Sequence, residues 1–189
     1  RPNEGKSTSA LALAAVLAST KKRILLIDGD MRNPSLHKML DGKNTTGLSN
    51  YLAGEDDLNK LIQRDTHYGF DAMPAGPIPP NAAELLSSTR MRELVAKLSE
   101  TYDSVIIDAP PVLGLADIPL LADSVEGVIY TIEAGGVKLR GIQAAIQRIR
   151  SSHAQIFGGI VTKVQSQQSG YGYGYAYEYS YGQKAPEVG

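Results

Sequence analysis

The chain has 189 residues, 42% of them apolar, which is enough for one globular domain with a full hydrophobic core. A net charge of −1 with both signs interspersed provides no electrostatic basis for binding nucleic acid or an anionic membrane surface. The lack of cysteine excludes disulfides and thiolate metal sites, and the longest apolar runs are shorter than the roughly 18 residues of a membrane-spanning helix.

The first part of the chain predicts a helix, a buried strand and several short helical pieces. Position 1 is Arg rather than Met, and we expect the native protein to extend further upstream. Residues 7–20, rich in Ala and Leu, predict a helix that begins at a Ser/Thr pair. The run 22–30, KRILLIDGD, is typical of a strand buried on both faces. Residues 34–64 contain short helical pieces, and 69–81 begins as a short strand and runs into a Pro/Gly loop.

The remainder of the ordered sequence alternates helices with strands. The predicted elements are a helix within 81–102, a buried strand at 103–111, a helix at 115–124, a strand at 126–134, a helix at 137–152 and a strand at 154–164. Such alternation indicates βαβ units, so we expect an α/β fold with a mostly parallel sheet covered by helices on both faces.

The segment EGKST at 4–8 opens the first predicted helix. A Gly-containing turn before a helix directs unpaired backbone N–H groups to one spot, where the helix dipole also favours negative charge. In such a loop Lys6 would reach the β- and γ-phosphates of a nucleotide, and the Ser7 hydroxyl would bind Mg²⁺. The four residues GKST alone fit equally well with an ordinary helix that Ser7 caps while Lys6 is solvated.

Acidic residues follow two of the buried strands. ILLID ends at Asp28, with Asp30 two residues later, and VIID ends at Asp108. Ligands of open parallel sheets bind outside the carboxyl ends of the strands, so these acids share a rim with the phosphate loop. Each Asp alone could simply close a turn. Together with EGKST they favour a Mg²⁺·nucleotide site and a three-layer sandwich of the P-loop NTPase type.

The composition changes abruptly after Val164. Residues 165–189 contain no Leu, Ile, Met or Phe, and tyrosine occupies every second position from Tyr171 to Tyr181. We expect 1–164 to form the P-loop domain, truncated at its N-terminus within the phosphate loop, and 165–189 to be a flexible tyrosine-rich tail.

EGKST, ILLIDGDMR, VIIDAPP and the tyrosine tail together resemble the bacterial tyrosine kinases (BY-kinases), the cytoplasmic kinase modules of capsule and exopolysaccharide export systems. In that family the three motifs are Walker A, Walker A′ and Walker B. The resemblance covers essentially the whole chain, including GLSNYLAGE at 47–55 and PAGPIPPNAAELL at 74–86.

The resemblance implies ATP and Mg²⁺ as cofactors and a role for each motif residue. Residues expected at the nucleotide are Asn3, Glu4, Gly5, Lys6, Ser7 and Thr8. Lys6 would hold the phosphates, and Ser7 would bind Mg²⁺. Asp28 would act near the metal and as the base toward the tyrosine hydroxyl, Asp30 would assist it, and Asp108 would hold the metal through water.

Two positions depart from the family pattern. Asn3 stands where the family commonly has Gly, although Asn tolerates left-handed backbone angles better than most residues. Related ATPases often contact adenine through an Asn after the last strand, where this chain has Thr162 and Lys163. The residue that contacts the base is therefore not predicted.

The tail would supply the acceptors of phosphoryl transfer. The expected phosphorylation sites are Tyr171, Tyr173, Tyr175, Tyr177, Tyr179 and Tyr181. Small residues between them would let any ring enter a shallow site, and several copies raise the effective concentration of acceptor. Each phosphate adds about −1.5 to −2 charges, so neighbouring subunits would repel one another. The alternative is an unmodified low-complexity tail that associates through aromatic contacts.

The resemblance also implies partners. The first partners are the tails of neighbouring subunits in a homo-oligomer, which would form a ring. The others are a membrane activator, either fused or separate, and a cognate tyrosine phosphatase. Nucleic acid is not an expected partner. The implied location is the cytoplasmic face of the bacterial inner membrane.

Two other functions remain open. The first is an ATPase switch like the partitioning and septum-positioning proteins, which carry a signature Lys where Arg1 stands and have no tyrosine tail. The second is a non-catalytic scaffold that binds nucleotide and uses its tail for adhesion.

Overall fold

The computed structural model describes residues 5–64, 66–110, 121, 124–151 and 155–164. The helices are α1 (Lys6–Ser19), α2 (Leu36–Met39), α3 (Leu48–Leu52), α4 (Leu58–Leu61), α5 (Ala82–Leu86), α6 (Thr89–Ser99) and α8 (Leu139–Arg150). The strands are β1 (Ile24–Asp28), β2 (Asp71–Met73), β3 (Ser104–Asp108), β4 (Gly127–Glu133) and β5 (Gln155–Thr162). The expected tail and most of the helix expected at 115–124 lie outside these residues.

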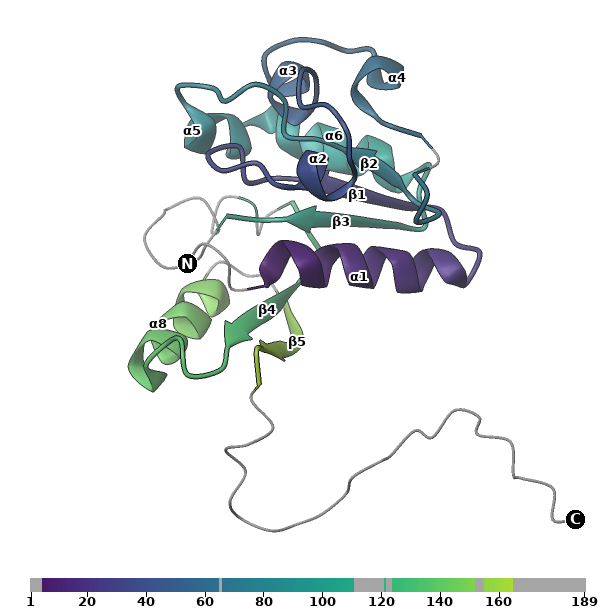
Figure 1. Ribbon diagram of the computed structural model, residues 1–189. Coiled ribbons are helices and arrows are strands. Elements are labelled where there is room, and N and C mark those ends of the chain that lie inside the picture. The colour runs from purple at the N-terminus through teal and green to yellow at the C-terminus, as the bar shows by residue number, and fades with distance from the viewer. Residues whose placement is uncertain (1–4, 65, 111–120, 122–123, 152–154, 165–189) are drawn as a thin grey trace, which may run out of the picture.

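Strand β1 is the centre of a three-stranded parallel sheet with the order β2-β1-β3 (Figure 1). Every residue of β1 is buried, as its unbroken apolar run predicts. Leu25 lies opposite both Asp71 of β2 and Val105 of β3. This register aligns the carboxyl ends of β1 and β3 at the same edge of the sheet.

Helices cover both faces of this sheet. Successive side chains of a strand point to opposite faces, and the two core clusters follow that alternation. Ile24 and Leu26 pack with Ala14 of α1, whereas Leu25 and Ile27 pack with the apolar side of α6, which includes Leu94. The expected three-layer α/β fold is confirmed.

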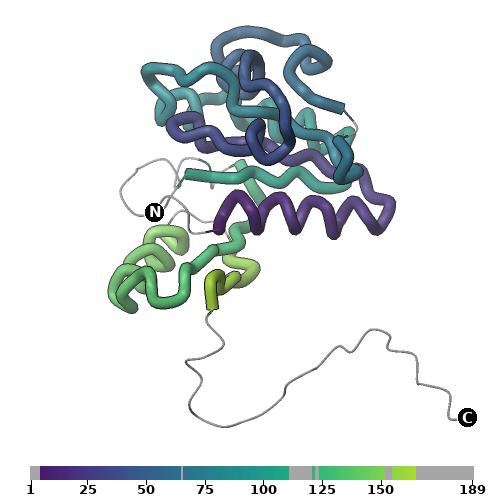
Figure 2. The backbone as a smooth tube through the Cα atoms, in the orientation of Figure 1, coloured from purple at the N-terminus to yellow at the C-terminus, as the bar shows by residue number. Residues whose placement is uncertain are grey.

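Strands β4 and β5 form a second parallel sheet, next to which α8 lies (Figure 2). The sequence predicted one continuous sheet, but no hydrogen-bonded ladder joins β3 to β4 within the part of the chain that the structure describes. The strand order therefore has a gap between these two edges.

The segments that resemble the kinase family at 47–55 and 74–86 lie side by side. Backbone N–H groups of Leu48 and Ser49 donate to the carbonyl oxygens of Pro74 and Ala75, at 2.8 Å each. A Cβ at Gly47 would overlap the Pro74 carbonyl, so only glycine fits this approach. These contacts hold the loop after β2 against α3.

None of the helices described is long and apolar enough to cross a membrane.

Candidate nucleotide and metal site

The predicted site residues of two strands meet at one rim of the sheet. Asp28 and Asp108 are register partners at the carboxyl ends of β1 and β3, and their exposed fractions are 0% and 3%. Helix α1 begins at this rim, and its first residue is Lys6. The structure thus brings together the three motifs that the sequence separates widely.

The loop before α1 turns at Gly5. This residue has φ of 81° and stands at the N-cap, where no side chain caps the helix. A Cβ added there would lie 3.2 Å from the Thr162 methyl carbon at the end of β5. Because no side chain caps the helix, the backbone N–H groups of its first turn keep their capacity to bind an anion. The alternative in which Ser7 caps the helix and Lys6 is solvated is wrong.

Lys6 forms an ion pair with Asp108. Its Nζ lies 3.2 Å from Oδ1 of Asp108, and the exposed fractions of the two side chains are 23% and 2%. The other carboxylate oxygen, Oδ2, is buried and accepts no hydrogen bond from the described residues. A buried carboxylate oxygen normally has a partner, so this one fits a bound water or cation.

Asp28 is surrounded by backbone donors. Its Oδ2 accepts N–H groups from Ser35 and Leu36, both at 2.9 Å, and its Oδ1 accepts the N–H of Asp30 at 3.2 Å. Burial raises the pKa of Asp28 to about 6; these hydrogen bonds oppose the increase, and the charge of Asp108 adds to it. A carboxylate offers about four acceptor positions, so Asp28 can still accept a proton.

Asp30 is buried at the same rim, and its backbone N–H donates to Asp28. Its Oδ1 accepts the backbone N–H of Asn33 at 3.1 Å, which shapes the turn after β1. No hydrogen bond or ion pair described in the structure joins Asp30 to Lys6, Ser7 or Asp108. The observed contacts are those of a turn residue.

Ser35 is a site residue that the sequence reasoning missed. Its hydroxyl donates to the hydroxyl of Ser7, with 3.0 Å between the oxygens. The available signal was a Ser directly before a short helix, a common N-cap position, but nothing local indicated its contact with the phosphate loop.

Of the remaining predicted site residues, the structure describes only Thr8. Thr8 is exposed on the first turn of α1, whereas Asn3, Glu4 and the tail tyrosines lie outside the described residues. Lys163, at the position where related ATPases contact adenine, instead pairs with Glu133 at 2.8 Å. The histidines and acids described form no group of three that could hold a metal on its own.

A phosphate-binding turn before a helix, with carboxylates at the ends of the neighbouring strands, defines the P-loop NTPase class of α/β fold. A family model described as "AAA domain" matches residues 4–158. Among curated proteins, Tyrosine-protein kinase YwqD of Bacillus subtilis (strain 168) is 37% identical over 171 residues, which are 90% of this chain and 72% of that protein. Tyrosine-protein kinase etk of Escherichia coli (strain K12) is 38% identical over 163 residues, 86% of this chain and 22% of that protein.

Solved structures agree with this assignment. The kinase domain of Escherichia coli tyrosine kinase ETK superimposes with a TM-score of 0.84 at 36% identity, covering 94% of this chain and 70% of that one. Cobyrinic acid a,c-diamide synthase from Mycobacterium smegmatis, solved with ADP and magnesium, has a TM-score of 0.74 at 21% identity, with 88% and 73% covered, and shares the fold alone.

The chain belongs to the family of bacterial tyrosine-protein kinases. The expected family and enzyme class are confirmed. The chain spans nearly three quarters of the Bacillus relative and less than a quarter of the Escherichia relative.

Proposed function

We propose that this chain is an ATP- and Mg²⁺-dependent protein-tyrosine kinase domain that phosphorylates its own tail in trans within a homo-oligomer. The observation that carries the proposal is the position of Lys6, Ser7 and Asp108 around one spot at the N-terminus of α1, with a buried, partnerless oxygen of Asp108 beside it.

The nucleotide phosphates would bind at the N-terminus of α1. Free N–H groups of the first turn and the helix dipole favour the negative charge, and Lys6 would exchange Asp108 for the β- and γ-phosphates. This exchange keeps the ammonium paired before and after binding, and a hydrated metal ion would then compensate the charge of Asp108.

The same rim fits a magnesium ion. Ser7 would supply its hydroxyl oxygen, and Oδ2 of Asp108 would hold the ion through a water molecule, which gives that buried oxygen its missing partner. A bound Mg²⁺ would neutralise charge on the transferring phosphate.

Asp28 would act as the base. At neutral pH a group with a pKa of about 6 is mostly ionised, yet it is more basic than an ordinary carboxylate. It would take the proton of the tyrosine hydroxyl while the phenolic oxygen bonds to the γ-phosphorus. The bond between that phosphorus and the β–γ bridging oxygen breaks, and ADP leaves with the bond electrons.

Burial disfavours two of the four described tyrosines as acceptors, whereas Tyr68 is 37% exposed. Tyr51 and Tyr102 are only 6% and 7% exposed. The Tyr102 hydroxyl also donates to Asp71 at 2.7 Å. We assign phosphorylation to the cluster from Tyr171 to Tyr181 because several copies raise the effective concentration of acceptor, and neighbouring copies would present it.

In the cell this activity would regulate polymerisation and export of capsule or exopolysaccharide. The proposed location is the cytoplasmic face of the inner membrane, with a membrane activator and a tyrosine phosphatase as partners. Relatives named as tyrosine-protein kinases support the kinase activity.

The direct test is incubation with ATP and Mg²⁺ followed by phosphosite mapping. A chain lacking 165–189 would be mixed with a Lys6→Met chain that keeps its tail, and phosphate should appear on the tail of the Lys6→Met chain. Each protein alone is the matched control and should remain unlabelled. ATP hydrolysis without labelled protein would instead support the partitioning-type switch, and nucleotide binding without turnover would support the scaffold.

A further inference from the structure

Basic residues are concentrated toward the C-terminal end of the chain. Residues 134–177 contain five Lys or Arg residues and no Asp or Glu, although the whole chain has 19 basic and 20 acidic residues. This stretch is therefore positively charged, while the rest of the chain is negatively charged. Four of its five basic residues lie in α8 or directly before it, and they are Lys138, Arg140, Arg148 and Arg150.

Helix α8 has a buried side and an exposed side. Ala145 and Ile149 on the buried side have exposed fractions of 0%. An α-helix has about 3.6 residues per turn, which places the three arginines of α8 on the other side, together with two glutamines. The exposed residues of the helix are Leu139, Arg140, Gln143, Ala144, Gln147, Arg148 and Arg150. Figure 1 shows α8 at the outside of the molecule, beyond β4 and away from β1.

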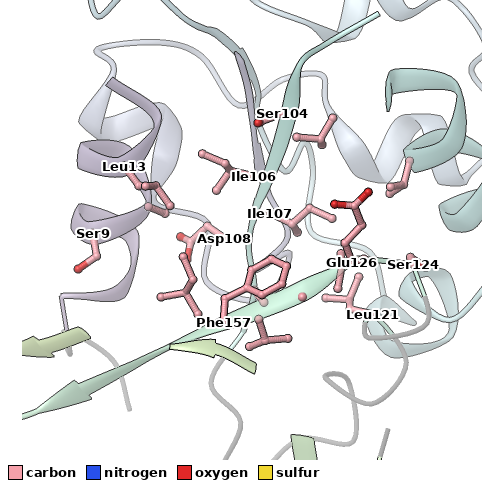
Figure 3. A pocket seen from close by; sticks show the side chains of 18 of the residues that line it. Ser9, Leu13, Ser104, Ile106, Ile107, Asp108, Leu121, Ser124, Glu126 and Phe157 are labelled. Atoms are coloured by element: carbon pink, nitrogen blue, oxygen red, sulfur yellow. The ribbon is translucent and has the colours of Figure 1, made fainter. Parts of the chain in front are cut away.

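The exposed side of α8 is separate from the cavity between the two sheets. That cavity has a volume of about 530 Å³, and its lining includes Ile107 of β3 and Phe157 of β5 (Figure 3). No residue of α8 contributes to this lining. The charged side of α8 is therefore a surface of its own, and the nucleotide site described above does not use it.

Ordinary structural roles account for only part of this charge. Among the described residues, no acid forms an ion pair with Lys138, Arg140 or Arg150. The helix dipole favours cations in the last turn, which explains Arg148 and Arg150. It disfavours a cation in the first turn, where Arg140 stands and no acid is present. Stability of the helix therefore leaves Arg140 unexplained.

A surface of this composition favours phosphate groups. The planar guanidinium of arginine donates two parallel hydrogen bonds to phosphate oxygens, and clusters of arginine recognise phosphorylated segments. Gln143 and Gln147 add amide donors on the same side of the helix. The chemistry of the exposed side of α8 therefore matches a segment that carries several phosphates.

The tail begins at the edge of the sheet from which the chain enters α8. Glu133 and Thr162 are register partners at the carboxyl ends of β4 and β5, and Lys163 pairs with Glu133 at 2.8 Å. Residues 134–138 lead from this edge to the first turn of α8, and the tail follows β5 from the same edge. The last turn of α8 leads into the start of β5, so it lies at the opposite edge.

We propose that the exposed side of α8 binds the tail of the same chain once the tyrosines from Tyr171 to Tyr181 carry phosphates. The proposal rests on the tail phosphorylation of the proposed function. Before phosphorylation the tail has two acids and one Lys, whereas six phosphates would add about −9 to −12 charges. The short connection to β5 raises the concentration of the tail at α8. Binding would therefore follow phosphorylation.

Binding along α8 would remove the phosphorylated tail from the rim of the nucleotide site. From its start beside the first turn, the tail would pass Arg140 and continue toward Arg148 and Arg150, at the opposite edge of the sheet. Phosphotyrosines held by these guanidinium groups would not return to the site that bears Lys6. That site would then remain open to unphosphorylated acceptors.

An anionic membrane surface fits this helix less well. Helices that lie on a membrane bury a broad apolar face in it. On the exposed side of α8, Leu139 is the only large apolar side chain, and it is 69% exposed. The tethered tail is therefore the favoured partner, and binding to vesicles is an outcome that the test below includes.

Fluorescence anisotropy with a labelled peptide of residues 165–189 tests the proposal. The peptide would be synthesised with phosphotyrosine at all six tail positions or at none, and titrated with the unphosphorylated 189-residue chain at low salt without nucleotide. We expect the phosphorylated peptide to bind at least about tenfold more tightly than the unmodified peptide. Because synthesis supplies the phosphates, a chain without kinase activity can still show this binding, and absence of binding leaves the kinase proposal intact.

The triple variant Arg140→Gln/Arg148→Gln/Arg150→Gln removes the three guanidinium groups. It should bind the phosphorylated peptide at least about tenfold more weakly than the unmodified chain. Gln is nearly as good a helix former as Arg, and circular dichroism would verify that the variant is folded. Lys at the same three positions keeps the charge without the planar fork, so this variant should lose less affinity than the Gln variant.

The matched control is Lys22→Gln/Arg23→Gln/Lys97→Gln, which removes the same charge from exposed positions on other elements. It should bind the phosphorylated peptide within about twofold of the unmodified chain. A chain whose own tail has been phosphorylated by an unrelated tyrosine kinase should bind the added peptide at least about tenfold more weakly, because its own tail occupies α8.

Four outcomes would overturn the proposal. The first is an equal loss of affinity in the Arg-to-Gln variant of α8 and in the control, since net charge alone would then explain the binding. The second is unchanged affinity in the α8 variant, and the third is undiminished binding of the peptide by the chain with a phosphorylated tail. The fourth is binding of the unphosphorylated chain to phosphatidylglycerol vesicles through α8 without affinity for the phosphorylated peptide.

Discussion

The ammonium of Lys6 lies 3.2 Å from the carboxylate of Asp108, and 102 residues of sequence separate the two. The contact ties the start of α1 to the end of β3 at the rim of the sheet. Because Asp108 is almost fully buried, its charge depends on Lys6 for compensation.

Removal of Lys6 should therefore destabilise the nucleotide-free protein. Lys6→Met leaves a buried carboxylate without its cation, and we expect a loss of about 1 to 3 kcal/mol in the free energy of unfolding. The double variant Lys6→Met/Asp108→Asn should recover much of this loss, because it removes the uncompensated charge. Urea denaturation of the four proteins of the cycle measures the coupling. A double variant less stable than Lys6→Met would contradict the ion-pair argument.

Stability should depend on the ionisation of Asp28. Burial raises the pKa of Asp28 in the folded state to about 6 from an ordinary value of 3.8, so the folded state favours the protonated acid. The contribution of Asp28 to the free energy of unfolding is complete below pH about 4. It is lost as the pH rises through about 6, which lowers the free energy of unfolding by roughly 3 kcal/mol.

Urea denaturation from pH 4 to 7, with EDTA and without nucleotide, would measure this slope. Asp28→Asn should flatten it, although the variant also loses a hydrogen bond, so the slope rather than the absolute stability is the informative quantity. A Tyr102→Phe variant, altered far from this carboxylate, is the control and should keep the slope. The same slope in Asp28→Asn as in the unmodified chain would show that another group titrates.

Ser35 should position the hydroxyl of Ser7 for magnesium. In the metal-free structure the Ser35 hydroxyl donates to Ser7, with 3.0 Å between the oxygens. Once the Ser7 oxygen binds the metal, this hydrogen bond would reverse, and Ser35 would accept the Ser7 proton. We expect Ser35→Ala to raise the Mg²⁺ concentration for half-maximal ATP binding by about tenfold. Ser35→Thr keeps the hydroxyl and should bind Mg²⁺ nearly as the unmodified chain does. Titration with a fluorescent ATP analogue distinguishes the variants, and equal Mg²⁺ dependence of all three would exclude this role.

Tyr102 should remain unphosphorylated while the tail is labelled. Its hydroxyl donates to Asp71 and accepts from Arg64 at 2.8 Å, and burial together with Asp71 raises the pKa of Tyr102 to about 12. Tyr102→Phe should leave the phosphate incorporated per chain unchanged and lower stability by about 1 kcal/mol. A large drop in incorporation would mean that Tyr102 is an acceptor. Replacement of all six tail tyrosines by Phe should abolish labelling.

Much of the fold could be predicted because the relevant signals are local. The apolar run that ends at Asp28 predicts a buried strand, Ala and Leu after Ser7 predict a helix, and the carboxyl ends of parallel strands share a rim. The phosphate loop, both strand-end acids and the kinase family therefore followed from the chain alone.

The remaining features of the site depend on contacts between distant segments, and only the tertiary structure shows them. No local pattern predicts the ion pair between Lys6 and Asp108 or the hydrogen bond between the Ser35 and Ser7 hydroxyls. The raised pKa of Asp28 arises from burial, which exists only after the helices have packed on the sheet. The gap between β3 and β4 has the same origin, because strand pairing is set by which edges meet in space and not by the order of elements along the chain.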